Sequence, residues 1–339
     1  MAASKDIILK VENLTKHFQP HQSFTQALAG QKNRRLIRAV DGISFEIARG
    51  EIFGLIGESG SGKTTTGKLV MKLLEPTGGS IWLDGNDVTH LGKEASRQYR
   101  TKVQMIFQDP YASMNPRFKI KDVLEEPLLI HKVNGNHQAR EEMIKKALEE
   151  VKLNPPEEFM GRWPHMLSGG QRQRVATART LILNPSLLVA DEPVSMIDLS
   201  TRAEILHMMK DVQRHLGLTY LYITHDLSTA RYFTDRIAVM YLGKIVEMGR
   251  AADIIDNPIH PYTKALIEAV PEPEPGKVHQ IKELPISGEI PSPANIPSGC
   301  RFHTRCPYAT KDCSEQAEPE LQDSGNGHFH ACRRWKEIG

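Results

Sequence analysis

The sequence predicts an α/β fold with a largely parallel central sheet. Apolar runs of strand length occur at 52–57, 103–107, 186–190 and 219–224. Amphipathic segments lie between these runs, and a glycine-rich loop directly follows the first of them. Continuous apolar runs are typical of strands that are buried on both faces, and strands that alternate with helices form parallel sheets.

The helices are predicted from the spacing of apolar residues. A helical run follows the glycine-rich loop at 65–74, and residues 141–153 place their apolar side chains on one face. Ser200 is a candidate N-cap for a helix with apolar residues at 205, 208, 209 and 212. A last helix is expected near 262–270.

Composition divides the 339 residues into three parts. Residues 1–268 carry the strand and helix pattern, and a polar stretch at 19–38 is interpreted as a solvated insertion. Nine of the 21 prolines lie between Pro258 and Pro297, so residues 269–298 are predicted to be an extended linker. Residues 299–339 form a short module that holds all four cysteines and is too small to rely on a large core of its own.

Charge and hydropathy exclude several classes of function. The formal net charge of +2 argues against a nucleic-acid partner. No stretch approaches 18 consecutive apolar residues, and the first residues lack the apolar core of a signal peptide. We therefore expect a chain that neither crosses a membrane nor leaves the cytosol by that route.

The glycine-rich loop predicts a phosphate site. Residues 57–64 read Gly-Glu-Ser-Gly-Ser-Gly-Lys-Thr, which is the pattern GxxxxGK followed by Ser or Thr. Glycines let successive backbone N–H groups turn towards phosphate oxygens, and the helix that follows adds the positive end of its dipole. Lys63 can reach the β- and γ-phosphates, and the Thr64 hydroxyl can ligate Mg²⁺.

Two adjacent acids end a buried apolar run at Asp191 and Glu192. The cost of desolvation disfavours such a pair unless it serves a cation or a reaction. Asp191 is placed to hold Mg²⁺ through water, and Glu192 is placed to polarise an attacking water. The alternative is a strand end that is simply exposed to solvent, and the phosphate-binding loop makes it less attractive.

The loop and the two acids are common to many nucleotide hydrolases, and a third segment narrows this class. Leu167-Ser-Gly-Gly-Gln171 precedes an amphipathic helix, which offers a second anion-binding helix N-terminus. Here the sequence resembles the ATP-binding-cassette (ABC) ATPases, whose signature is this pentapeptide, over about residues 7–250. The resemblance implies a P-loop ABC cassette at 1–268, with a mainly parallel mixed sheet, an antiparallel β subdomain and a helical subdomain at about 110–170.

The resemblance also implies a role for each matching residue. ATP would be bound by Phe18, stacked on adenine, and by the loop residues Gly57, Ser59, Gly60, Ser61, Gly62, Lys63, Thr64 and Thr65. Mg²⁺ would be held by Thr64, Gln108 and Asp191, and the catalytic residues would be Glu192, His225 and Gln108. Two cassettes would face each other head to tail, so that ATP on one is completed by the partner's signature residues: Ser168, Gly169, Gly170 and Gln171. Asp198 would couple the two ATP sites, while Phe18 and His225 also have ordinary structural alternatives.

Further segments resemble the oligopeptide/dipeptide importer branch of this family. They are the runs 109–116 and 257–266 and the cysteine-bearing end with Phe302-His-Thr-Arg-Cys306-Pro. The resemblance implies a peptide importer with a paralogous ATP-binding subunit as heterodimer partner, two transmembrane permease subunits and an extracytoplasmic solute-binding protein. The chain would then lie on the cytoplasmic face of the inner membrane as a peripheral subunit. Importers of oligosaccharides or metal complexes belong to the same branch and remain alternatives.

The four cysteines are spaced C-x₅-C-x₆-C-x₁₈-C, at 300, 306, 313 and 332. A cytosolic location disfavours disulfides, zinc sites more often show closely spaced pairs, and the short ferredoxin spacing is absent. Spacing alone therefore does not name the metal. The resemblance favours one 4Fe–4S cluster bound by Cys300, Cys306, Cys313 and Cys332, with zinc as the alternative. His303, His328 and His330 are candidate substitute ligands.

Functions of other classes fit the sequence less well than an importer does. Cassette ATPases of DNA repair or chromosome structure need long coiled coils or inserted DNA-binding domains, and the chain has neither. Cassette proteins of translation carry two cassettes in one chain, whereas a single phosphate-binding loop occurs here. A nucleic-acid-binding zinc module at the end of the chain fits poorly with the near-balanced charge.

Overall fold

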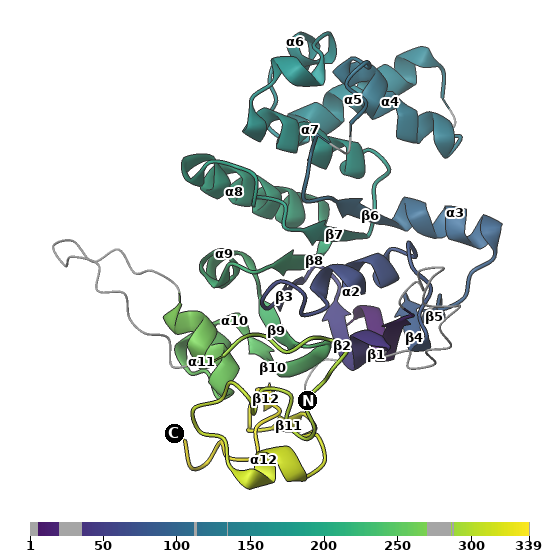
Figure 1. Cartoon of the computed structure of the whole chain (residues 1–339). Helices are drawn as coiled ribbons and strands as arrows, with labels where there is room; N and C mark the ends of the chain where they lie inside the picture. Colours follow the sequence, from purple (N-terminus) through teal and green to yellow (C-terminus); the bar gives the residue numbers. More distant parts are fainter. Residues whose placement is uncertain are drawn as a thin grey trace, which may run out of the picture.

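The computed structural model describes residues 6–19, 36–111, 114–133, 135–269, 286 and 288–338. Two sheets organise these residues (Figure 1), an eight-stranded sheet in the order β11-β12-β10-β9-β3-β8-β7-β6 and a four-stranded sheet in the order β2-β1-β4-β5. Most of the 19–38 insertion and of the 269–298 linker lies outside the described residues.

The larger sheet contains the predicted parallel core. β3 (Ile52–Ile56) pairs in parallel with β8 (Thr219–Thr224) and β9 (Arg236–Tyr241), and β7 (Leu187–Asp191) pairs in parallel with β6 (Val103–Ile106) and β8. Every residue of β3, β7 and β8 is buried, as their continuous apolar runs predict. The four predicted strands are confirmed within one or two residues at each end.

The smaller sheet is antiparallel, as the resemblance implied. It is formed by β1 (Ile7–Phe18), β2 (Ile37–Ala48), β4 (Gly78–Leu83) and β5 (Asn86–Asp87). Alternating side chains of β1 and β2 join residues of β3, β7 and β8 in one buried core. α2 (Lys63–Val70) contributes Leu69 and Val70 to that core, so the helix after the glycine-rich loop is fixed between the two sheets.

The helical part lies at the top of Figure 1, beyond β6, and α7 packs it against β6 and α8. It comprises α4 (Ile120–Ile130), α5 (His137–Glu150), α6 (Pro156–Met160) and α7 (Gly169–Leu181), with a 3₁₀ turn at Pro164–Met166. α3 (Lys93–Lys102) leads into β6, while α9 (Leu227–Phe233) and α10 (Ala251–Asp256) pack together beside β9. The helix predicted at 141–153 is α5, which begins earlier, at His137, because Asn136 caps it through Ala139 N.

One predicted helix start is wrong by two residues. α8 (Leu199–Leu216) has Asp198 and not Ser200 at its N-cap position, and Asp198 makes no side-chain capping hydrogen bond. The backbone N–H groups of Thr201 and Arg202 donate to the Asp198 carbonyl, so the helical ladder is already formed before Ser200 could cap it.

The end of the chain packs against the larger sheet. After α11 (Pro261–Glu268), β12 (Phe329–His330) pairs with β10 (Lys244–Arg250), and β11 (Gln322–Asp323) pairs with β12. We call residues 299–338, including α12 (Lys311–Glu315), the tail; it lies at the bottom of Figure 1. Phe302, with 1% of its surface exposed, belongs to the same core cluster as Ile56 and Val239. The tail therefore shares the cassette's core.

In the described part of the chain, no helix is long and apolar enough to cross a membrane.

Candidate nucleotide-binding site

The glycine-rich loop lies between β3 and α2, and two of its glycines are required by their surroundings. Gly57 has φ of 154° and Gly62 has φ of 109°. A Cβ atom at Gly57 would lie 2.2 Å from the Met240 carbonyl oxygen, and one at Gly62 would lie 2.3 Å from the Ala39 carbonyl oxygen. The loop is thus confined between β9 and β2, and only glycine fits at these positions.

Lys63 is buried and points back into the loop. Its Nζ donates to the carbonyl oxygens of Gly57 at 2.7 Å and Glu58 at 2.9 Å, and it lies 3.4 Å from Ser61 Oγ. Burial lowers the pKa of Lys63, and the acidic residues nearby oppose that shift. The ammonium group therefore has three oxygen atoms as neighbours. Phosphate oxygens are acceptors for the same kind of hydrogen bond.

The remaining loop residues differ in their exposure to solvent. Ser59, Gly60 and Thr64 are exposed, and Thr65 is half-buried in α2. Ser61 is buried, and its carbonyl accepts from Gly243 N at 2.9 Å.

Thr64 and Asp191 meet where α2 begins and β7 ends. The Thr64 hydroxyl donates to Asp191 Oδ1 at 3.1 Å. Burial raises the pKa of Asp191, while the hydrogen bond from Thr64 opposes that rise. A hydroxyl and a carboxylate are hard oxygen ligands, so this donor set fits Mg²⁺.

Glu192 is held by the other two predicted catalytic residues. Gln108 Nε2 donates to Glu192 Oε2 at 2.9 Å, and His225 Nδ1 lies 2.9 Å from Glu192 Oε1. Glu192 has φ of 47°, an unusual backbone conformation that turns the chain after β7. The structure thus brings Gln108, Glu192 and His225 together from three segments that follow β6, β7 and β8.

The signature residues lie at the start of α7, in the helical part of the molecule. The Ser168 hydroxyl accepts from Gln171 N at 3.2 Å, and Ser168 N donates to Gln171 Oε1 at 3.0 Å, which is a capping box. A Cβ atom at Gly170 would lie 2.6 Å from Thr201 Cγ2, so α7 approaches α8 closely there, whereas Gly169 faces open space. Among the described residues, no hydrogen bond joins this segment to the glycine-rich loop.

Phe18 and Asp198 lie at the two edges of the site. Phe18 ends β1 opposite Ile37, two residues from Ala39, whose carbonyl abuts Gly62. Its half-buried ring has the Lys16 ammonium 5.3 Å from its centroid. Asp198 is exposed at the start of α8, between the exposed side chains of Met196 and Leu199.

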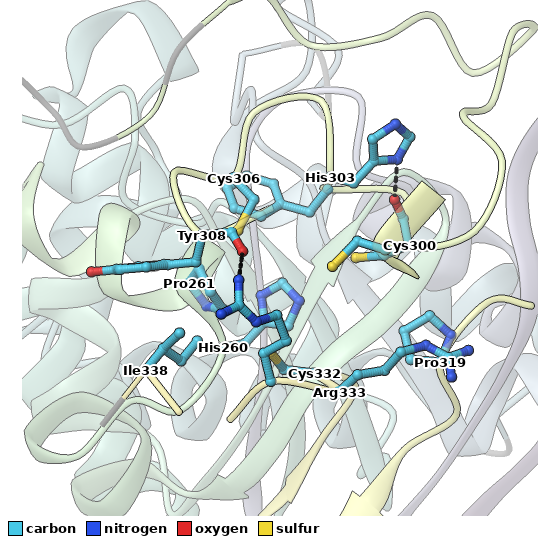
Figure 2. A pocket seen from close by; sticks show the side chains of 13 residues that line it. His260, Pro261, Cys300, His303, Cys306, Tyr308, Pro319, Cys332, Arg333 and Ile338 are labelled. Carbon is cyan, nitrogen blue, oxygen red and sulfur yellow. Dashed lines mark hydrogen bonds between the residues drawn. The ribbon is translucent and has the colours of Figure 1, made fainter. Parts of the chain in front are cut away.

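The four cysteines line one small cavity in the tail (Figure 2), together with His260, Phe302 and His303. All four are free thiols, and burial raises the pKa of Cys300, Cys306 and Cys332 to about 11. Within the described ranges, however, no group of three or more His, Cys, Asp or Glu side chains lies close enough to hold one metal ion. Neither the expected 4Fe–4S cluster nor the zinc alternative therefore gains support from the positions of these side chains.

The candidate substitute ligands have other partners or places. His303 lies at the cavity, where its Nδ1 is 2.8 Å from the Cys300 carbonyl oxygen. His328 Nε2 is 2.7 Å from Glu247 Oε1, on the β10 side of the tail. His330 accepts from Cys332 N through Nδ1, and its ring packs on Trp335 with a centroid distance of 5.0 Å.

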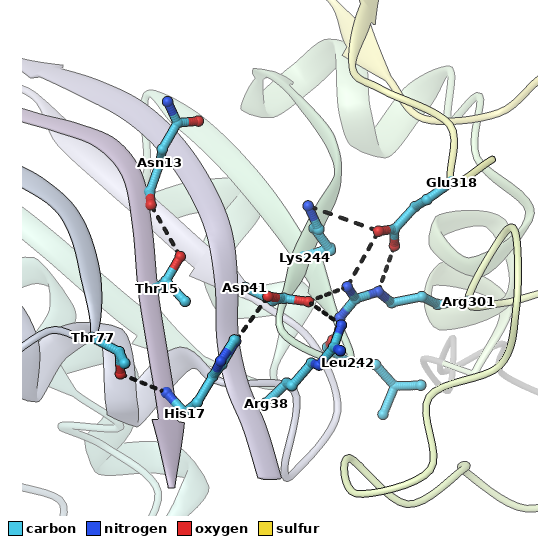
Figure 3. A network of polar contacts seen from close by, with 10 residues as sticks. All are labelled: Asn13, Thr15, His17, Arg38, Asp41, Thr77, Leu242, Lys244, Arg301 and Glu318. Atoms are coloured by element: carbon cyan, nitrogen blue, oxygen red, sulfur yellow. Dashed lines mark hydrogen bonds and ion pairs between the residues drawn. The ribbon is translucent and has the colours of Figure 1, made fainter. Parts of the chain in front are cut away.

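Sequence reasoning missed the arginines that join the tail to the site. Arg301, which follows Cys300, contacts Asp41 of β2, Glu318 of the tail and the Leu242 carbonyl (Figure 3). The other oxygen of Asp41 lies 2.9 Å from His17 Nε2, next to Phe18. The only local signal was an arginine beside each of the first two cysteines, at 301 and 305.

Comparisons with known proteins agree with this arrangement. Residues 40–195 match the family described as ABC transporter, and residues 246–313 match the one described as oligopeptide/dipeptide transporter, C-terminal region. The oligopeptide transport ATP-binding protein AppF of Bacillus subtilis (strain 168) is 43% identical over 332 residues, 98% of this chain and 98% of AppF. YkfD of the same strain is 44% identical over 331 residues, 98% of this chain and 96% of YkfD.

Solved structures give the same fold. The dimeric, post-hydrolysis ATP-binding cassette MJ0796, bound to ADP and Pi, superposes with a TM-score of 0.62 at 28% identity, covering 72% of this chain and 99% of that chain. The likeness to cbiO1 from Clostridium perfringens is one of fold, with a TM-score of 0.64 at 24% identity over 75% of this chain and 92% of that chain.

Proposed function

The chain belongs to the ABC transporter ATPases, in the branch of the oligopeptide and dipeptide transporters, and on that premise we propose that it drives peptide uptake through membrane permease subunits. The observation that carries the proposal is the convergence of Gln108 and His225 on Glu192, beside the Thr64–Asp191 pair. The names of AppF and of the family matched at 246–313 favour peptides as the transported solute.

The proposed division of labour follows from this geometry. Glu192 would polarise the attacking water. Gln108 and His225 each hold one carboxylate oxygen of Glu192, and His225 would also contact the γ-phosphate. Thr64, Asp191 and Gln108 would hold Mg²⁺, which when bound neutralises charge on the β- and γ-phosphates. The phosphates would be bound by Lys63 and by the loop residues Gly57, Ser59, Gly60, Ser61, Gly62, Thr64 and Thr65, and Phe18 would stack on the adenine ring.

We further propose that the site is completed by a second, paralogous cassette. Ser168, Gly169, Gly170 and Gln171 lie at the start of α7 in the helical part, and within the described chain no hydrogen bond joins them to the glycine-rich loop, which supports a role at the ATP of a partner. Near Asp198, Met196 is 66% exposed and Leu199 is 81% exposed. Such apolar exposure beside a coupling residue suits a face that a partner covers.

The permease subunits are proposed to dock next to Gln108. Phe107, directly before Gln108, is 44% exposed, and Tyr111, three residues after it, is 55% exposed. Movement of a permease there would reach Glu192 through the hydrogen bond from Gln108. The chain would thus be peripheral, on the cytoplasmic face of the inner membrane, and a solute-binding protein would deliver peptides from the other side.

For the tail we propose one 4Fe–4S cluster bound by the four cysteines, clamping the tail in place. The support for it is that all four cysteines line the same cavity, and that 4Fe–4S clusters are held by four cysteine thiolates. Anaerobic purification followed by iron and sulfide analysis tests it: four irons per chain, absent from Cys306→Ser, are expected. A colourless protein that contains zinc or no metal would overturn the cluster.

The transport role is tested in the assembled complex. The chain, purified from detergent-solubilised membranes, is expected to bring permease subunits and a second cassette with it. After reconstitution with the binding protein, peptides should stimulate ATP hydrolysis, whereas oligosaccharides and metal complexes should not. Stimulation by one of those solutes alone would move the chain to the alternative importers. Recovery on nucleic acid or ribosomes would overturn transport altogether.

A further inference from the structure

Arg305 of the tail contacts the glycine-rich loop directly. Its Nη1 donates to Glu58 Oε2 at 2.8 Å and its Nη2 donates to Glu58 Oε1 at 3.2 Å, a two-pronged ion pair. The Arg305 side chain is 6% exposed and that of Glu58 is 26% exposed. Partial burial and paired geometry make this one of the stronger kinds of ion pair.

A second contact fixes the backbone of the same residue. Glu58 N donates to the Tyr262 hydroxyl of α11 at 2.9 Å, and the Glu58 carbonyl accepts from Lys63 Nζ at 2.9 Å. The Tyr262 ring in turn packs on Phe302 of the tail with a centroid distance of 5.4 Å. Glu58 is therefore held at its side chain, its N–H and its carbonyl.

We propose that Arg305 and Tyr262 are positioning residues that set the affinity of the site for nucleotide by holding Glu58. The inference rests on the proposed ATP site and assigns a role to a loop position that the phosphate-binding pattern leaves open. Two effects act together. The contacts of Arg305 and Tyr262 with Glu58 pre-organise the loop and Lys63 for binding. Arg305 also neutralises the Glu58 carboxylate, which would otherwise repel the phosphates.

The two effects predict that a second substitution, at Glu58, restores part of the affinity that Arg305→Met loses. Arg305→Met leaves the Glu58 charge unpaired beside the phosphates, so the Kd for ADP should rise about tenfold, the scale of one charged hydrogen bond. Adding Glu58→Gln removes the repelling charge, so the double variant should bind ADP more tightly than Arg305→Met alone. Because an unpaired Glu58 can also lower the stability of the fold, urea unfolding of both variants is measured beside the Kd, and the Kd is compared only between folded chains.

Binding of MgADP to the full-length chain is measured by titration calorimetry, and ATP hydrolysis is measured in the complex. We expect KM for ATP to rise with Arg305→Met while kcat changes less than KM, because Glu192 and its partners are untouched. Arg333→Met is the matched control, since Arg333 contacts Gln316 and Ala317 inside the tail. It should leave the Kd unchanged.

Tyr262→Phe provides a second test of the positioning role if Arg305→Met does not fold. It retains the packed ring and removes only the oxygen that accepts from Glu58 N. A rise of a few fold in the Kd for ADP is expected, against no change for Tyr308→Phe on an exposed ring of the tail. Unchanged affinity in Arg305→Met or Tyr262→Phe overturns the positioning role. A wild-type chain that binds no nucleotide overturns the proposed function instead.

Discussion

Arg301 and Asp41 are 260 positions apart in the chain, and the Arg301 guanidinium lies 2.5 Å from Asp41 Oδ2. His17 holds the other oxygen of the same carboxylate at 2.9 Å. Burial works against ionisation of Asp41, but the hydrogen bonds from Arg301 and His17 outweigh it and hold its pKa at about 2. The tail is thus joined to the strand that ends in Phe18 through one ionised carboxylate.

Asp41→Asn should lower the stability of the protein in a pH-dependent way. Because the pKa of Asp41 is lowered by folding, its stabilising effect is present above about pH 4 and is lost as pH falls towards 2. We expect a loss of about 2 kcal/mol in the free energy of unfolding at pH 7. Urea unfolding at pH 7 and pH 3 measures it, with Asp6→Asn, in an exposed pair with Arg49, as the control. An equal deficit at both pH values would contradict the linkage.

Glu192→Gln should abolish ATP hydrolysis and preserve ATP binding. Glutamine has the same shape and can keep contacts with Gln108 and His225, but it cannot polarise water as a base. We expect hydrolysis at this site to fall by about 10²–10⁴-fold and ATP to trap the closed dimer. Hydrolysis is measured with the partner cassette inactivated, since its own site could mask the loss. Normal turnover at the single site would remove Glu192 from the role of base.

The parallel strands were predictable because burial on both faces leaves a continuous apolar run. Residues 219–224 are such a run, and β8 matches them residue for residue. The start of α8 was not predictable, since Asp198 and Ser200 are both common capping residues. Arg202 Nε donates to the Ile197 carbonyl and so helps fix the earlier start, and that contact exists only in the folded chain.

The nucleotide site also has one part that the sequence predicts and one part that it does not. The glycine-rich loop is one contiguous segment, so its pattern can be read directly from the sequence. The arginine contacts join residues 260 positions apart for Arg301 and 247 for Arg305, and no local pattern marks their partners. The loop was therefore predictable from its own residues, whereas the contacts of Arg301 and Arg305 could be identified only in the structure.

Ser168 has a capping role that can be separated from its proposed role in the partner's ATP site. Its hydroxyl accepts from Gln171 N, so Ser168→Ala should cost about 1 kcal/mol of stability. Ser168→Asp keeps a capping oxygen but brings a negative charge to the place proposed for a phosphate. We expect Ser168→Asp to unfold at nearly the wild-type temperature and to abolish ATP-driven dimerisation. Dimerisation of Ser168→Asp at the wild-type ATP concentration would contradict the trans contact.

Phe302→Ala should destabilise the cassette as well as the tail. Phe302 is 1% exposed and packs against Tyr241 and Tyr262, with ring centroids 5.3 Å and 5.4 Å away. Removing a buried phenyl ring costs about 3–5 kcal/mol. Because the core cluster is shared, that cost should appear in the main unfolding transition, followed in urea by far-ultraviolet circular dichroism.

Tyr308→Ala is the matched control for Phe302→Ala, since Tyr308 lies in the same tail with 42% of its surface exposed. It should shift the unfolding midpoint by less than a quarter of the Phe302→Ala shift, because little buried area is lost. Limited proteolysis separates the two ways in which the tail could be attached. A tail held by its cysteines alone would be released in Phe302→Ala with the cassette's midpoint unchanged, whereas a shared core requires the midpoint and the tail's protease resistance to fall together.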